Sequence, residues 1–209
     1  MLAELTGFAE DTQGRVRLHT VSLIRWVAVI GQLFTILFVD FSLGIALPVA
    51  ALLPAVALSA LVNLLLSLSL KATTRLPERS AAGLFAFDIL QLAYLLALTG
   101  GVQNPFAVLL LVPLALAAVT LDVRSTVGVT VLALVCVATL AVGAGPLPWR
   151  EGGLTLPALF RVGGWAALSL AIILIAIFAW SVAEEARQRA EALAATQLAL
   201  AREQELSAL

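Results

Sequence analysis

The chain has 209 residues, of which 62% are hydrophobic and 12% charged, with a formal net charge of −1. This composition excludes a water-soluble globular class, because several apolar runs exceed the ~18 residues that indicate a membrane-spanning helix. The net charge itself says nothing about partners, because the charges are unevenly distributed along the chain; no nucleic-acid partner is expected. The single cysteine, Cys136, lies in an apolar run, so we expect no disulfide, and no metal site is predicted.

The apolar runs divide the chain into three predicted parts: a cytoplasmic lead-in over 1–21, a transmembrane domain over 22–182 and a cytoplasmic signalling helix over 183–209. The fold class is all-α, a polytopic membrane protein with six transmembrane helices and a C-terminal helix. The spans are expected at about 22–41, 44–70, 81–98, 105–121, from 124 to about 142, and 158–182.

Prolines interrupt two of these predicted helices. Pro48 and Pro54 should bend or end the second helix, and Pro113 interrupts the fourth. The fourth helix is also short, because its 17 residues reach about 25 Å at ~1.5 Å per residue, slightly less than a hydrocarbon core.

The basic residues decide the predicted orientation in the bacterial inner membrane. With both termini in the cytoplasm, nine Lys and Arg residues fall in inner segments and two, Arg150 and Arg161, in outer segments. An excess of positive charge marks the cytoplasmic side. The turn after the third span is therefore expected on the periplasmic side, and Trp149 near the outer interface.

A short uncharged turn, Thr99-Gly100-Gly101-Val102-Gln103-Asn104-Pro105-Phe106, separates the third and fourth spans. Its two glycines permit positive φ and a close approach of another molecule to the main chain. Asn104-Pro105 has the form of a helix start, with Asn104 as N-cap. The helix N-terminus, the amides of Gln103 and Asn104 and the flat face of Phe106 suit a ring that bears carbonyl groups. The alternative is a tight, well-capped turn with no ligand.

Amide and carboxyl side chains within the first three spans form a second candidate cluster: Gln32, Asn63, Asp88 and Gln91. Asn63 and Asp88 both lie roughly 12 Å from the cytoplasmic ends of their helices at ~1.5 Å per residue, so they could meet. Gln91 is one turn beyond Asp88 on the same face, which predicts a polar seam joining the three helices. Asp88 is either a proton-relay or switch element or a hydrogen-bonded packing residue.

The composition changes at Ala183, after which Glu and Arg alternate with Ala and Leu and both Gly and Pro are absent. Glu185 and Arg189, spaced i,i+4, support a solvent-exposed helix. Leu193 and Leu200, seven residues apart, favour a parallel coiled coil and hence a homodimer. The alternative is a lone amphipathic tail. Because the last residue stops the helix without a cap, we expect the chain to be cut short of a further domain.

Four stretches of the sequence carry a family resemblance. They are Arg17-Leu18-His19-Thr20 with Arg25-Trp26, Phe87-Asp88-Ile89-Leu90-Gln91-Leu92, residues 98–106, and Ala183-Glu184-Glu185-Ala186-Arg187 with residues 198–204. Together they resemble the RegB/PrrB redox-responsive sensor histidine kinases of proteobacteria. The pattern Gly-Gly-x-x-Asn-Pro-Phe at 100–106 resembles that family's quinone-binding signature. The resemblance implies that ubiquinone is bound by Gly100, Gly101, Gln103, Asn104, Pro105 and Phe106.

The resemblance also implies a function for the whole protein. Members of that family sense the ubiquinone pool, autophosphorylate a cytoplasmic histidine and pass the phosphoryl group to a response regulator; a respiratory oxidase is a further candidate partner. This chain has no ATP-binding glycine boxes, and its one histidine, His19, is expected at the surface without a catalytic role. We therefore predict a lipid-embedded, homodimeric sensing domain that is not an enzyme by itself. The alternative is a small carrier or channel that uses Asn63, Asp88 and Gln91 as its pathway.

Three expectations concern mechanism. Ubiquinone should bind without turnover, because residues 99–106 contain no Asp, Glu, His or Lys to relay protons. Asn104 should donate an amide N–H to a quinone carbonyl while its oxygen caps the fourth helix, and Phe106 should stack on the ring. Trp149 and Trp165 should sense a displacement that then passes along the sixth helix.

Overall fold

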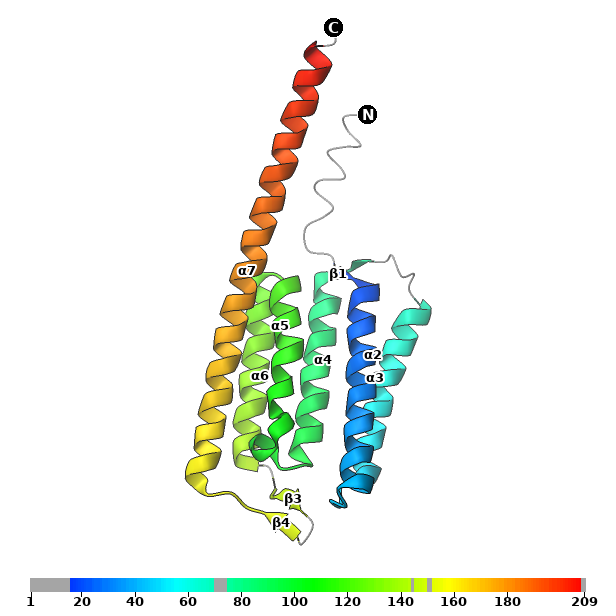
Figure 1. Cartoon of the computed structure of the whole chain (residues 1–209), viewed down its shortest axis with the longest axis vertical. Helices are drawn as coiled ribbons and strands as arrows, with labels where there is room; N and C mark the ends of the chain where they lie inside the picture. Colours follow the sequence, from blue (N-terminus) through cyan, green and yellow to red (C-terminus); the bar gives the residue numbers. More distant parts are fainter. Residues whose placement is uncertain (1–15, 70–74, 144, 150–151, 208–209) are drawn as a thin grey trace.

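The computed structural model describes residues 16–69, 75–143, 145–149 and 152–207 as a set of long helices with two small strand pairs (Figure 1). The elements in chain order are β1 (Val16–Arg17), α2 (Leu18–Leu37), the π-helix η1 (Phe38–Ser42), α3 (Val49–Ser69), β2 (Arg75–Leu76), α4 (Glu78–Ala97), the 3₁₀ helices η2 (Gly101–Gln103) and η3 (Pro105–Leu110), α5 (Leu111–Thr120), α6 (Val123–Gly143), β3 (Leu147–Trp149), β4 (Gly152–Leu154) and α7 (Ala158–Ser207). Most of the predicted lead-in, residues 1–15, lies outside the described residues, and α2 begins earlier than the expected first span.

Five of the described helices are long and apolar enough to cross a membrane. They are Ser22–Ser42, Val49–Ser69, Glu78–Ala97, Val123–Gly143 and Ala158–Gln197. They match five of the six expected spans, which confirms an all-α membrane protein. The expected fourth span is Pro105–Thr120, an apolar helix shorter than the others, so a sixth crossing stays a prediction.

The prolines lie at or near helix starts and do not end the helices, so that part of the expectation is wrong, whereas a bend stays a prediction. Pro48 precedes α3, and its carbonyl accepts the first helical hydrogen bonds. Pro54 lies inside α3, which continues past it. The expected fourth helix is 3₁₀ over Pro105–Leu110 and becomes α-helical at Leu111, so Pro113 falls in the first α-helical turn. A missing N–H costs little there.

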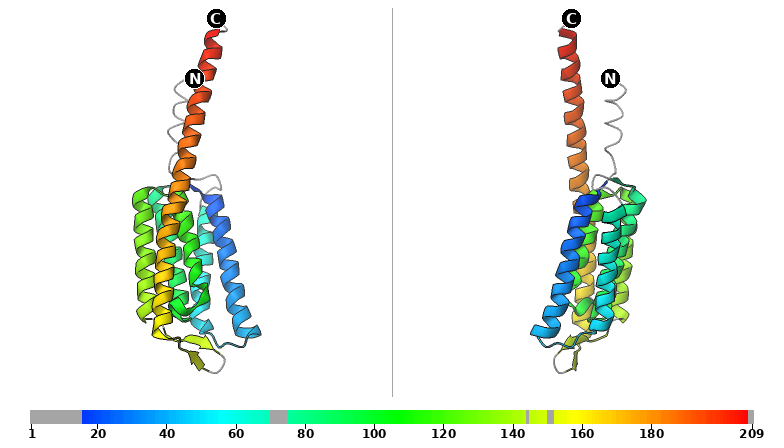
Figure 2. Two further views of the ribbon diagram at one scale, coloured as in Figure 1. Left: turned by 60° about the vertical axis from the view of Figure 1, so that its left-hand side comes forward. Right: turned by 90° about the vertical axis from the view of Figure 1, so that its right-hand side faces the viewer.

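The helices pack as two units with separate hydrophobic clusters. α4, α5, α6 and α7 form a four-helix bundle around fully buried side chains that include Ile89, Leu114 and Ile172. α2 and α3 pack on each other around Leu52, and their cluster meets Leu95 of α4. Figures 1 and 2 show this α2–α3 pair beside the bundle, next to α4. The joint between the two units therefore runs along α4, which packs against α3 and lies beside α2.

The predicted loop over 143–157 contains a β-hairpin that the sequence did not reveal. β3 and β4 pair antiparallel, with Leu147 opposite Leu154 and Trp149 opposite Gly152. Strands of three residues are too short for a visible alternation of apolar and polar residues. We call the end of the molecule with residues 99–106 and this hairpin the turn end, and the end from which α7 projects the exit end (Figure 1).

α7 is one unbroken helix of 50 residues that extends far beyond the bundle (Figure 1). The expected domain boundary at 182–183 therefore lies within a continuous helix, at the point where its sequence changes from apolar to charged. Near the exit end Arg187 donates from Nη2 to the Val119 carbonyl in the last turn of α5, 3.0 Å away. The expected ion pair between Glu185 and Arg189 is present. The coiled coil and the homodimer stay predictions.

Candidate functional site

The glycines of the turn adopt the predicted backbone conformation. Gly100 has a φ of 104° and Gly101 a φ of 62°, which side chains with a Cβ rarely adopt. A Cβ placed on Gly100 would lie 2.8 Å from Leu147 Cδ1 and 2.9 Å from Leu147 Cα. The glycines are expected to admit another molecule; at Gly100 the structure instead places strand β3 of the same chain.

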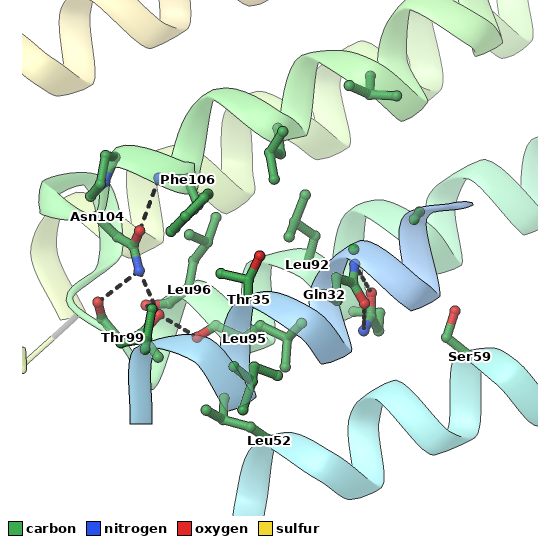
Figure 3. A pocket seen from close by; sticks show the side chains of 18 of the residues that line it. Gln32, Thr35, Leu52, Ser59, Leu92, Leu95, Leu96, Thr99, Asn104 and Phe106 are labelled. Atoms are coloured by element: carbon green, nitrogen blue, oxygen red, sulfur yellow. Dashed lines mark hydrogen bonds between the residues drawn. The ribbon is translucent and has the colours of Figure 1, made fainter. Parts of the chain in front are cut away.

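Asn104 holds the turn together through three hydrogen bonds (Figure 3). Its Oδ1 accepts from the Phe106 N–H at 2.9 Å, which confirms the predicted N-cap, although the first turns are 3₁₀. Its Nδ2 donates to the Thr99 carbonyl at 3.0 Å and to Thr99 Oγ1 at 2.8 Å, and that hydroxyl donates to the Leu95 carbonyl. An amide nitrogen has two N–H groups. Both are used within the turn in this structure, so donation from Asn104 to a quinone carbonyl stays a prediction and would require one of these bonds to open.

Gln103 connects the turn to the segment that leads into α7. Its Oε1 accepts from the Leu156 backbone N–H at 3.0 Å. A Cβ on Gly164, in the second turn of α7, would lie 3.7 Å from the Val102 carbonyl. The turn is thus in direct contact with the start of α7.

A cavity of about 620 Å³ lies between α2, α4 and α5 and extends from the turn end toward the exit end. Its volume is within the 300–1,000 Å³ typical of small-molecule sites. Most of its lining is apolar, and the polar lining residues are Arg25, Gln32, Thr35, Ser59, Asp88, Gln91, Thr99 and Asn104. Figure 3 shows Asn104 and Phe106 at one end of this cavity and Gln32 farther along α2.

Two polar pairs link α2 to α4 within the cavity wall. Gln32 and Gln91 exchange amide hydrogen bonds, with Nε2–Oε1 distances of 3.3 and 3.0 Å. Arg25 Nη2 lies 3.1 Å from Asp88 Oδ1, and the guanidinium carbon lies 5.5 Å from the centroid of the Phe87 ring. The expected seam between the first and third spans is therefore present, with Arg25 as a member that the sequence did not predict.

Asn63 does not meet Asp88, which corrects the expected contact. Its Nδ2 donates to the Ser22 carbonyl at 3.0 Å, and its own carbonyl accepts from Ser67 Oγ at 2.8 Å. Asp88 pairs with Arg25 instead, because a cation is a stronger partner for a carboxylate than a neutral amide. Asn63 thus joins α2 to α3 outside the cavity lining, and it does not continue the route that a carrier pathway would need.

The structure divides the predicted site residues into two groups. Those that line the cavity are Gln32, Asp88, Gln91, Asn104, Pro105, Phe106 and Trp149. Those that are not in its lining are Gly100, Gly101, Gln103, Asn63 and Trp165. The first two of these shape the turn, and Gln103 fixes it to the segment before α7.

Three residues of the site were missed from the sequence. Arg25 was noted only as part of the family resemblance, although an arginine and an aspartate within the spans of one helical domain are natural partners. Thr99 receives the Asn104 amide, a short-range bond that its spacing could have suggested. No sequence signal could identify Leu147 as the neighbour of Gly100, because the two meet only through the hairpin.

The chain is similar to known proteins over nearly its whole length. No family model matches it, and no solved structure matches it. Two curated sequences of "Sensor histidine kinase RegB", both from Cereibacter sphaeroides, are 40% and 39% identical to it over 201 residues. The matched region is 95% of this chain and 44% of each relative, so the chain spans less than half the length of those relatives. The resemblance inferred from the sequence is confirmed.

Proposed function

We propose that this chain, similar over 95% of its length to RegB sensor histidine kinases, is the membrane sensing region of such a kinase and binds ubiquinone. The observation that carries the proposal is the cavity between α2, α4 and α5, because Asn104, Pro105 and Phe106 form part of its wall. These residues are the last three of the Gly-Gly-x-x-Asn-Pro-Phe pattern. A ligand-sized cavity and the motif therefore coincide.

Access from the bilayer is supported by the side chains at the cavity edge. Phe106, Leu109 and Val112 line the cavity and are 41%, 40% and 47% exposed. In a membrane-embedded helix such side chains also face lipid. A ligand dissolved in the bilayer, such as an isoprenoid quinone, can enter sideways without crossing water.

Phe106 is the proposed contact for the quinone ring at the turn end. An aromatic ring stacks in an offset arrangement on another flat ring, and Pro105 and Trp149 add apolar surface beside it. Asn104 acts on this contact indirectly, because its cap fixes the backbone of Phe106. Gly100, Gly101 and Gln103 support the same turn from outside the cavity lining.

Sensing requires binding and not turnover. The turn residues 99–106 carry no titratable side chain, and the carboxylate in the cavity lining, Asp88, is paired with Arg25. Different affinities of two conformations for the oxidised and reduced ligand are enough to shift an equilibrium between them.

The proposed relay runs through α7. The turn contacts α7 through η2 and is bonded to the segment before α7 through Gln103 and Leu156, and the helix is continuous to the exit end. A displacement of packed helices can therefore reach the far end of α7 without an intervening loop. Trp149 and Trp165 lie near the turn end of this path.

The activity of the whole protein is part of the proposal. The kinase region would autophosphorylate a histidine and pass the phosphoryl group to a response regulator, and α7 would continue into a homodimeric coiled coil. The charge distribution favours the bacterial inner membrane with both termini in the cytoplasm. The turn end would then face the periplasm, and a respiratory oxidase is a further candidate partner.

The test is a titration of the purified chain in lipid nanodiscs with ubiquinone-1. Trp149 lies in the cavity lining, so a bound quinone should quench its fluorescence. Phe106→Ala should weaken binding about tenfold or more, since a lost aromatic contact and its buried area are worth about 1.5–3 kcal/mol.

Phe160→Ala is the matched control, because Phe160 is 59% exposed on α7 and is not in the cavity lining. It should bind as the parent does. Equal loss in both variants, or no saturable quenching in the parent, would contradict the proposed site. Substrate flux in liposomes without quinone binding would favour the carrier.

A further inference from the structure

The guanidinium group of Arg25 is the least satisfied polar group in the cavity wall. The residue is 5% exposed and lines the cavity. Its Nη2 lies 3.1 Å from Asp88, but within the described part of the chain none of its three nitrogen atoms makes a hydrogen bond of good geometry. An unpaired buried donor is costly, and more so when it is charged.

Asp88 has spare capacity beside it. An ionised carboxylate accepts about four hydrogen bonds, and the contact with Arg25 Nη2 involves one of its two oxygen atoms. The pair therefore offers N–H donors and carboxylate acceptors a few ångströms apart, in the same cavity wall. Gln32 and Gln91, the next polar pair toward the turn end, add an amide donor and acceptor if their mutual bonds open.

The turn end offers a different chemistry. Both N–H groups of Asn104 and the Thr99 hydroxyl proton are already donated within the turn. A quinone ring, which only accepts hydrogen bonds, can rest there on Phe106 at modest cost. A hydroquinone carries two hydroxyl donors, and the acceptors left for them there are neutral oxygens such as Asn104 Oδ1, which already accepts from the Phe106 N–H; these are weaker partners for a hydroxyl than a carboxylate.

We propose that the exit-end half of the cavity is a second ring site, selective for the reduced ligand. In it a hydroquinone hydroxyl donates to the Asp88 carboxylate, and its oxygen accepts from an Arg25 N–H. This inference rests on the proposed function, since it takes the ligand to be a ubiquinone. It adds a separate position for the reduced form to the outer position on Phe106.

The proposed site lies where it can affect the packing of the two helical units. Arg25 belongs to the α2–α3 pair and Asp88 to the α4–α7 bundle. A hydroxyl placed between them changes the direct ion pair into a bridge through the ligand. Movement of the ring between the two positions then alters the link between the units, and only one redox form makes that link.

The test compares ubiquinone-1 with ubiquinol-1, the latter under anaerobic conditions, in nanodiscs that contain the purified chain. Bound ligand is extracted and quantified, with empty nanodiscs as the blank. Arg25→Met combined with Asp88→Leu removes both charges, so that neither is left alone in the membrane. This double variant should bind ubiquinol-1 roughly tenfold more weakly or worse, as expected for lost bonds to charged groups, and ubiquinone-1 within about twofold of the parent.

Two other variants complete the comparison. Phe106→Ala should show the opposite selectivity, with the larger loss for ubiquinone-1. Asn63→Leu removes a polar contact to α2 outside the cavity lining and should leave both affinities unchanged. Melting temperatures of all variants check that each is folded.

The outcomes separate the two proposals. Unchanged ubiquinol-1 affinity in the Arg25/Asp88 double variant overturns the second site while the outer site stands. Equal loss of both ligands in that variant also overturns it, because the selectivity would be absent. A parent that binds neither ligand overturns both proposals.

Discussion

Substitution of Gly100 by alanine tests whether strand β3 is docked on the glycine turn. The added Cβ would lie 2.8 Å from Leu147 Cδ1 and 2.9 Å from Leu147 Cα. The Cδ1 atom can move with its side chain, but the Cα atom moves only with the hairpin. The residue would also have to keep a φ of 104°, so the native turn becomes strained in two independent ways.

The two costs can be estimated separately. A positive φ costs a residue with a Cβ about 1–2 kcal/mol, and forcing an extra carbon into a filled space costs about 1–3 kcal/mol. Only the second cost is relieved when the hairpin undocks, so the opening equilibrium should shift by about 1–3 kcal/mol, or roughly five- to a hundredfold. Leu147→Ala added to Gly100→Ala should recover only part of this, because the contact with Leu147 Cα remains.

Hydrogen exchange of peptides covering residues 153–160 measures the opening. In the parent, the Leu156 N–H is bonded to Gln103, so its exchange reports undocking directly. Gly128→Ala is the control, since no heavy atom lies within 4 Å of its added Cβ, and helical alanine should stabilise by about 0.5–1 kcal/mol. If Gly100→Ala exchanged no faster than the parent in this segment, the close packing of Gly100 and Leu147 would be refuted.

Three further predictions concern other parts of the chain. Gln103→Leu should speed exchange of the Leu156 N–H by about fivefold, since a lost hydrogen bond is worth about 1 kcal/mol, while Gln103→Glu keeps the acceptor and should change it little. The Ser125 N–H, which donates to Asp122, holds the pKa of that carboxyl below its usual value. The ionised Asp122 carboxylate therefore stabilises the fold fully above its unfolded-state pKa, and this stabilisation is lost as pH falls through its folded-state pKa. Melting temperatures measured across this pH range should show the loss. One alanine inserted after Ala183 in a longer chain with the kinase region should rotate the downstream part of α7 by about 100° at ~3.6 residues per turn and disrupt quinone-dependent regulation.

Each of these predictions has a control and a contradicting result. Equal exchange in Gln103→Leu and the parent would mean that the bond to Leu156 does not hold the segment. Asp122→Asn keeps a side-chain oxygen that can accept from the Ser125 N–H but cannot titrate, so the decrease in melting temperature at low pH should become smaller. An unchanged decrease would assign the pH dependence to another group. Insertion of seven residues restores the helical phase approximately and should restore regulation, whereas normal regulation after a single insertion excludes helix rotation as the signal.

The helices and the cap could be predicted because their signals are local. Apolar runs show where a helix can span a membrane, and Asn104 next to Pro105 specifies a helix start whatever surrounds it. The positive φ of Gly100 is expected from the residue type in a tight turn. These inferences did not require knowledge of which helices are neighbours.

The pairings across helices could not be predicted in the same way. Whether Asp88 meets Asn63 or Arg25 depends on the rotation of each helix about its axis. One packing of the helices would bring Asn63 within reach of Asp88, and another brings Arg25 within reach. The apolar periodicity that normally fixes rotation is weak in a membrane helix, where both the lipid-facing and the buried faces are apolar. The Gly100–Leu147 contact depends in turn on a hairpin too short to recognise.

The hydrogen bond between Arg187 and the Val119 carbonyl gives α7 the geometry of a lever with an internal fulcrum. The arm from Ala158 to Arg187 is about 44 Å long and the arm from Arg187 to Ser207 about 30 Å, at ~1.5 Å per residue. A sideways shift of the first arm would therefore arrive at the far end reversed in direction and reduced to about two-thirds, whereas a shift along the axis or a twist would arrive undiminished. If Arg187 holds its contact while the helix moves, axial and torsional motions are the efficient ones.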